Sequence, residues 1–122
     1  MTDFIRRILF VDAATCVGTG LFLALLAAPL APVLGLSADL LLYAGLALLP
    51  IAAFIAWVAT RAQMSAAGVR LVIIGNAAWV VASLALLFAV SPTVLGYAFV
   101  IGQALIVAAL AEMEYVGLRR IA

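Results

Sequence analysis

Four apolar runs, each about twenty residues or longer, occupy nearly the whole of the 122-residue chain. About 20 apolar residues is the length that an α-helix needs to cross the hydrocarbon core of a bilayer. Hydrophobic residues make up 70% of the chain and charged residues only 9%, against about 25% charged residues in soluble domains. The sequence therefore predicts an integral membrane protein with no separate soluble domain.

Prolines and serines divide the chain into the expected helices. Pro29 and Pro32 are expected to end the first helix, because proline removes a backbone donor and clashes with the preceding turn. The segment Pro29–Leu36 then reads as a short apolar connection. Ser37 is placed to cap the second helix and Ser91 the fourth. The expected spans are about 4–28, 37–61, 66–90 and 92–118, within one membrane domain that covers 1–122.

The basic residues lie only near the chain ends and around the gap between the second and third runs. Basic residues stay on the cytoplasmic side when helices insert. The pattern therefore predicts an all-α, transmembrane, up-down four-helix bundle with N- and C-termini cytoplasmic, in a bacterial inner membrane. The inner-interface arginines are Arg6, Arg7, Arg61, Arg70, Arg119 and Arg120.

Composition argues against several classes of function. The chain has no histidine, which is the usual general base and the commonest metal ligand. Its one cysteine, Cys16, allows neither an intrachain disulfide nor a thiolate cluster. A net charge of +1 gives no basic patch for nucleic acid. We therefore expect no catalytic residue, no metal, no cofactor and no nucleic-acid partner.

A layer of polar residues is expected just inside the basic ring. Asp12, Asn76 and Glu112 come from three different helices, and each lies six or seven residues from an arginine. At about 1.5 Å per residue they share one level, ~9–10 Å inside the ring. A carboxylate at that depth is costly unless it is paired, protonated or hydrated. Supporting roles in this layer are assigned to Thr15, Cys16, Gln103 and Glu114.

Helical spacing gives directions to some of these side chains. Small residues follow Asp12 at intervals of four, so its face of the helix is expected to meet another helix. The third helix offers a small surface to meet it, made of Gly75, Ala78, Ala82 and Ser83. Gln103 and Glu114 share one face of the last helix, because eleven residues return to nearly the same angle. Glu112 points to the opposite side, and Glu114 is the acid expected to pair with the terminal arginines.

Three interpretations of the polar layer stay open. The favoured one is a lattice in which the arginines snorkel and bond to the acids, locking the inner helix ends together. The second is a proton- or cation-binding site formed by Asp12 and Glu112 near Asn76. The third is a contact with another protein. Trp79, which lies deep in the third helix, is expected to fill a packing gap rather than to bond through its N–H.

Three segments resemble short, uncharacterised four-helix membrane proteins of proteobacteria. These are a DAATC segment at 12–16, a GNAAW segment at 75–79 and an EYVGLRR segment at 114–120. The resemblance implies a bacterial membrane protein and supplies no activity. The chain is also similar in length and helix number to small multidrug resistance exporters, with Asp12 in the place of their acidic residue. That family uses a glutamate at its site, and its dual-topology members have a balanced charge bias, whereas the six arginines of this chain are expected on one side.

These observations predict a small polytopic inner-membrane protein, foremost a non-enzymatic accessory or structural component. The alternative is a small proton- or cation-coupled transporter or channel subunit that uses Asp12 and Glu112. A third reading is a binder of lipid or an apolar ligand, in a cleft opened by Pro50. The expected partners are the lipid bilayer and a homo-oligomer or larger membrane complex.

Overall fold

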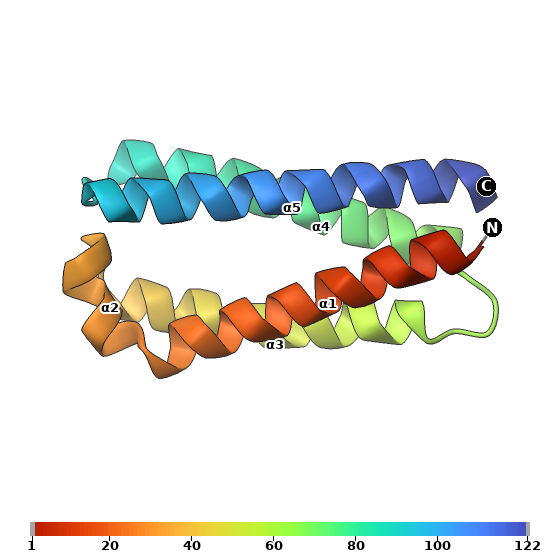
Figure 1. Cartoon of the computed structure of the whole chain (residues 1–122), viewed down its shortest axis with the longest axis horizontal. Helices are drawn as coiled ribbons and strands as arrows, with labels where there is room; N and C mark the ends of the chain where they lie inside the picture. The colour runs from red at the N-terminus through yellow and green to blue at the C-terminus, as the bar shows by residue number, and fades with distance from the viewer. Residues whose placement is uncertain (1, 122) are drawn as a thin grey trace.

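The computed structural model describes residues 2–121, which form five α-helices. Four are long and apolar enough to cross a membrane, so the chain is an all-helical bundle, as the apolar runs predicted. Both termini lie at one end of the bundle and α2 lies at the other (Figure 1). The helices are α1 (Thr2–Leu25), α2 (Ala27–Leu34), α3 (Ala38–Ala59), α4 (Ala66–Ala89) and α5 (Val94–Ile121).

The first expected helix is in fact two helices, because α1 ends at Leu25 and α2 begins at Ala27. Proline clashes with the carbonyl four residues before it, and for Pro29 that carbonyl belongs to Leu25. The break therefore falls one turn earlier than expected. The segment after Pro29 is helical rather than a loop, since a proline in the first turn of α2 loses no intrahelical hydrogen bond. Pro32 lies inside α2, so the expectation that it ends a helix is wrong.

Side-chain caps set the starts of the later helices. Ser37 Oγ accepts from the Leu40 N–H at 3.0 Å, which confirms its expected role. The expected cap at Ser91 is wrong, because Thr93 holds that position and its Oγ1 accepts from the Gly96 N–H at 3.1 Å. Thr93 is fixed there by α2: its N–H donates to Leu34 O at 3.1 Å and its hydroxyl to Val33 O at 2.7 Å.

The bundle consists of two helix pairs, α1 with α3 and α4 with α5. Consecutive helices α3 and α4 touch only slightly, although a short connection joins them. The α1–α3 pair is close because Gly20 and Gly45 meet backbone to backbone. A Cβ on Gly20 would lie 2.8 Å from Gly45 O. The small face that follows Asp12 therefore does meet a helix, but that helix is α3 rather than the expected 66–90 helix, whose Gly75 has open space around it.

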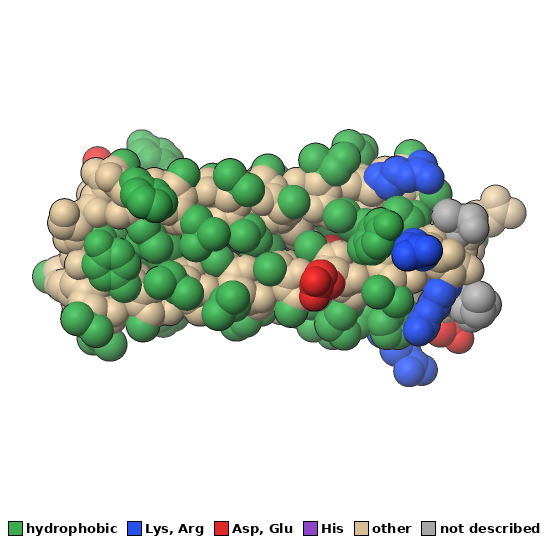
Figure 2. All heavy atoms as spheres, turned by 90° about the horizontal axis from the view of Figure 1, so that it is seen from above, with side chains coloured by type: hydrophobic (Ala, Val, Ile, Leu, Met, Phe, Trp, Pro, Cys, Tyr) green, Lys and Arg blue, Asp and Glu red, His purple; other side chains and the backbone are tan. Residues whose placement is uncertain are grey.

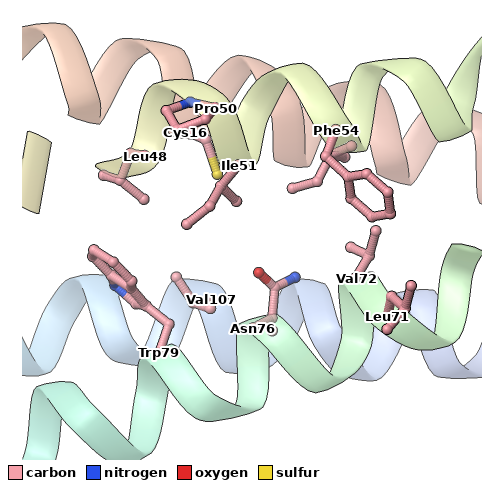
Figure 3. Close-up of a pocket in the computed structure, with 12 residues that line it drawn as sticks. Cys16, Leu48, Pro50, Ile51, Phe54, Leu71, Val72, Asn76, Trp79 and Val107 are labelled. Atoms are coloured by element: carbon pink, nitrogen blue, oxygen red, sulfur yellow. The ribbon is translucent and has the colours of Figure 1, made fainter. Parts of the chain in front are cut away.

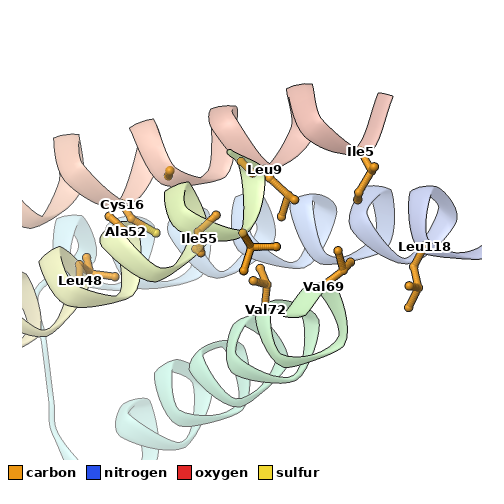
Figure 4. Close-up of a cluster of buried hydrophobic side chains, with 12 residues drawn as sticks. Ile5, Leu9, Cys16, Leu48, Ala52, Ile55, Val69, Val72 and Leu118 are labelled. Carbon is orange, nitrogen blue, oxygen red and sulfur yellow. The ribbon is translucent and has the colours of Figure 1, made fainter. Parts of the chain in front are cut away.

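A buried apolar cluster joins both pairs at the end that carries the termini (Figure 4). Ile5 and Leu9 of α1 contribute to it with Ile55 of α3, Val69 of α4 and Leu118 of α5. The basic side chains gather at this same end (Figure 2). The pairs are thus held together at the basic end and again where α2 meets α5, with the polar site between these two regions.

Candidate functional site

Three buried polar side chains from three helices meet inside the bundle. Asp12 of α1, Asn76 of α4 and Glu114 of α5 are 1%, 6% and 0% exposed. Asn76 Nδ2 donates to Asp12 Oδ2 at 2.7 Å and to Glu114 Oε1 at 2.8 Å. Among residues 3–121 these are the only buried polar or charged side chains. We call Asp12, Asn76 and Glu114 the polar triad.

The two carboxyl groups fix the orientation of the Asn76 amide. An ionised carboxylate only accepts hydrogen bonds, so it requires the NH2 end of the amide. Both side-chain N–H groups of Asn76 therefore donate to the acids. Its carbonyl Oδ1 accepts no hydrogen bond from the part of the chain that is described.

The acids themselves are incompletely satisfied. Glu114 Oε2 is buried and has no hydrogen-bond partner within the described residues. Asp12 Oδ2 and Glu114 Oε1 accept from the same nitrogen of Asn76, at 2.7 and 2.8 Å, so the two carboxyl groups are neighbours. A direct hydrogen bond between two carboxyls needs a proton on one of them. The triad is therefore two neighbouring acids with one amide that donates to both.

The triad contains Glu114 where Glu112 was expected. Glu112 lies on the outer surface of α5, beside Phe4 and Tyr115, and does not reach Asp12 or Asn76. The two glutamates are two residues apart, so they point about 200° apart around the helix. The face shared by Gln103 and Glu114 turns inward, whereas the face of Glu112 turns outward.

The arginines do not form the expected lattice with these acids. Within residues 2–121 their hydrogen bonds go to backbone carbonyls or to a hydroxyl. Arg6 donates to Ala59 O and, at 3.0 Å, to Arg61 O, closing the end of α3. Arg61 lies 4.8 Å over the Trp57 ring and Arg119 lies 5.8 Å over that of Tyr115. Arg7, Arg70 and Arg120 are exposed.

Two of the expected supporting residues lie next to the triad on α1. Cys16 is buried, and its Sγ–H donates to Asp12 Oδ1 at 3.7 Å, a weak hydrogen bond. Thr15 bonds back to Val11 O at 2.8 Å, as threonine commonly does in a helix. Both side chains line a cavity of about 60 Å³ that also touches Asp12.

A second polar cluster joins α4 to α5. Trp79 Nε1 donates to Gln103 Oε1 at 2.9 Å, and Gln103 Nε2 donates to Ser83 Oγ at 2.9 Å. The expectation that Trp79 serves packing alone is therefore wrong. Sequence reasoning did not link these three residues. Their spacing offers one signal, because Trp79 and Ser83 are four apart and so share a helix face.

Three cavities surround these clusters. The largest, about 360 Å³, lies between α3 and α4 and is lined by Asn76, Trp79 and Pro50 among others (Figure 3). The second is the cavity of about 60 Å³ beside Asp12, and the third, about 70 Å³, lies further from the basic end. Thr19, Trp79 and Gln103 line both small cavities, which therefore follow one another along the interior.

The chemistry available at this site is proton exchange or hydrogen bonding, since it offers carboxyls, an amide and a thiol. Comparison of the chain with protein-family models, with curated protein sequences and with solved structures gave no match. The reading of the site therefore rests on its geometry.

Proposed function

We propose that this chain is a small, multi-pass inner-membrane protein that carries protons, and that the polar triad is its proton site. The four apolar helices are compatible with a membrane protein. In the proposed arrangement they form an up-down bundle with both termini in the cytoplasm. The gathering of basic side chains at the terminal end (Figure 2) supports this orientation.

One observation carries the proposal: two buried carboxyl groups share the Asn76 nitrogen as a donor, and Glu114 Oε2 has no partner in the described chain. Two like charges in an apolar interior repel each other and are poorly solvated. A proton shared by Asp12 and Glu114 removes one charge and gives Oε2 a hydrogen bond. The arginines supply no such compensation, because they bond elsewhere.

A proton fits this site better than a metal cation. Hard cations bind oxygen ligands, but Asn76 turns its NH2 group toward the two acids. Those N–H groups occupy the directions from which a cation would approach the facing carboxylate oxygens. A proton needs no such space, since it lies within a hydrogen bond.

The two small cavities support a path for protons along the interior. A water molecule occupies about 30 Å³ of liquid volume, so cavities of about 60 and 70 Å³ each have room for water. Thr15 and Thr19 offer hydroxyl groups along this path, and Gln103 offers its amide. The path leads from Asp12 toward the end opposite the basic residues.

The proton site is tested by infrared difference spectroscopy of the purified protein during a pH titration. A buried protonated carboxyl gives a C=O band that carboxylates lack. We expect this band in the native protein, and we expect its loss in Glu114→Gln together with a changed band in Asp12→Asn. Glu112→Gln is the matched control, two residues away on the same helix, and should leave the titration unchanged.

Proton flux into liposomes under an imposed potential tests the transport role. A pH-sensitive dye inside the liposomes should report uptake through the native protein and through Glu112→Gln. With Glu114→Gln or Asp12→Asn, uptake should fall to the level of protein-free liposomes. An unchanged band in Glu114→Gln, or equal flux through the Glu112 and Glu114 variants, would contradict the proposal.

A second candidate is a structural or accessory role, in which the polar triad only joins the helix pairs. The observation in its favour is that the triad links α1 of one pair with α4 and α5 of the other. If this role is correct, the native protein should show the infrared band but no proton flux, and Asp12→Asn should lower the stability of the fold in detergent. Partner proteins, or a second copy of the chain, would then be expected to co-purify from native membranes.

A further inference from the structure

The cavity between α3 and α4 has the size of a small-molecule site. Its volume of about 360 Å³ falls in the range of known ligand pockets, and an apolar cavity of about 150 Å³ already admits benzene. It remains open because α3 and α4 hardly touch. Exposed apolar side chains from both helices, Ile51, Phe54 and Leu71, line it and form a hydrophobic entrance.

The lining is apolar except at Asn76 and Cys16. Trp79 stands toward one end of the cavity and Phe54 toward the other, with Asn76 between them (Figure 3). Cys16 is the other polar residue in the wall, and its thiol is directed to Asp12. The two aromatic rings offer flat surfaces for a ring-shaped ligand.

Asn76 offers a hydrogen-bond acceptor to a ligand in this cavity. Its two N–H bonds are held by Asp12 and Glu114, so the atom left over is the carbonyl Oδ1. A ligand with an O–H or N–H group can satisfy Oδ1, whereas an ether or a ketone cannot. An anionic ligand would also meet the negative charge of the acids directly behind the amide.

We propose that this cavity binds a small, membrane-soluble aromatic molecule that carries one hydrogen-bond donor, and that the donor bonds to Asn76 Oδ1. The proposal rests on the proposed function in one respect, that the acids behind Asn76 change their protonation. Binding itself needs only the cavity and the fixed amide.

Protonation of the acids should oppose binding. When both carboxyls are protonated, either can donate an O–H to Asn76 Oδ1, which turns the amide and removes the acceptor from the cavity. The titratable groups at this place are Asp12, Glu114 and the Cys16 thiol, while α3 contributes the apolar Ile55. Ligand affinity should therefore fall as the pH is lowered, and by linkage the ligand should release a proton.

The binding test uses 2-naphthol, which has a donor, and 2-methoxynaphthalene, which has the same ring system without one. Trp79 lines the cavity and Trp57 does not, so quenching of Trp79 is read in a Trp57→Phe background in lipid nanodiscs. We expect 2-naphthol to bind about fivefold more tightly, the effect of one hydrogen bond. Equal affinity of the two compounds, or no quenching by either, would overturn the proposal.

Two variants separate this proposal from the proton site. Ile51→Phe fills part of the cavity without touching an acid, so it should abolish quenching and leave the infrared band intact. Glu114→Gln leaves Asp12 as the one acid behind Asn76, so 2-naphthol binding to this variant should depend less on pH than binding to the native protein. Quenching that survives in Ile51→Phe would place the ligand elsewhere and overturn the proposal. Absence of the infrared band from the native protein, together with tight 2-naphthol binding, would instead overturn the proton site alone.

Discussion

Gln103 is the best-satisfied polar side chain in the interior. Its Oε1 accepts from Trp79 Nε1 at 2.9 Å, and its Nε2 donates to Ser83 Oγ and to Val100 O, both at 2.9 Å. The Ser83 hydroxyl in turn donates to Trp79 O at 2.7 Å. This single amide therefore joins α4 to α5 and holds the indole ring in the wall of all three cavities.

Replacing this amide by an apolar side chain should destabilise the bundle. Gln103→Leu keeps most of the volume but leaves the Trp79 N–H without its acceptor and removes the donor to Ser83 Oγ. We expect the free energy of unfolding to fall by about 1 kcal/mol, measured by denaturation in detergent. The matched control is Gln63→Leu, because Gln63 is exposed in the connection between α3 and α4. A similar effect of both variants would contradict the assigned role.

The identity of the paired acid shows what sequence can say at this scale. Depth along a helix follows from residue counting, and it brought Asp12 and Asn76 to one level. The direction of a side chain around the helix depends on which face packs inward. In α5 the polar Gln103 marks that face, and Glu114 shares it. Counting from Arg119 favoured Glu112, but the inward face belongs to Glu114. The sequence could not predict that Asn76 Oδ1 is left without a hydrogen bond, because this depends on the contacts of Nδ2 with acids on two other helices.

Among the helices, the α1–α3 pair depends on the close approach of two backbones. Gly20 and Gly45 face each other, and a Cβ on Gly45 would lie 2.6 Å from Gly20 O. Gly18, two residues away on α1, has open space where its Cβ would be. Two glycines of the same helix therefore have different roles.

Alanine substitution should separate these roles. In Gly20→Ala the new methyl group forces α1 from α3, and we expect a loss of about 1–3 kcal/mol of stability. In Gly18→Ala the methyl meets nothing and the helix gains propensity, for a change of up to about 1 kcal/mol in the opposite direction. Thermal unfolding in one detergent compares the two. Equal losses would show that the glycines serve the helix backbone rather than the contact.

The helix boundaries were partly predictable. The Ser37 cap followed from local chemistry, because a serine before an apolar run needs only its own next turn. The start of α5 could not be predicted in this way. Thr93 rather than Ser91 caps it because Thr93 is held by bonds to Val33 and Leu34, about sixty residues earlier in the chain. Pro29 was correctly identified as a breaker, and the error lay in placing the break at the proline rather than four residues before it.

The whole molecule has one basic end and one end without basic residues (Figure 2). The basic end also holds the apolar cluster and both termini. The opposite end contains α2 and its contact with the start of α5. This asymmetry means that a single labelling experiment can decide the orientation of the bundle.

Cysteine labelling tests that orientation. In a Cys16→Ala background, Gln63→Cys and Ser91→Cys place single exposed thiols at opposite ends of the bundle. We expect a membrane-impermeant maleimide to label Ser91→Cys in spheroplasts and Gln63→Cys only after lysis. The reverse pattern would invert the bundle, and labelling of both in intact spheroplasts would rule out a single fixed orientation.

Main-chain atoms come into direct contact at the joint between α2 and α5. Gly35 has a φ of 68°, and a Cβ there would lie 2.6 Å from Thr93 N, while one on Gly96 would collide with Leu34 O. What this joint requires of its two glycines is therefore the absence of a side chain. Libraries that randomise the exposed flanking positions should yield many folded clones, whereas every insertion of a methyl group at 35 or 96 should be lost from the survivors.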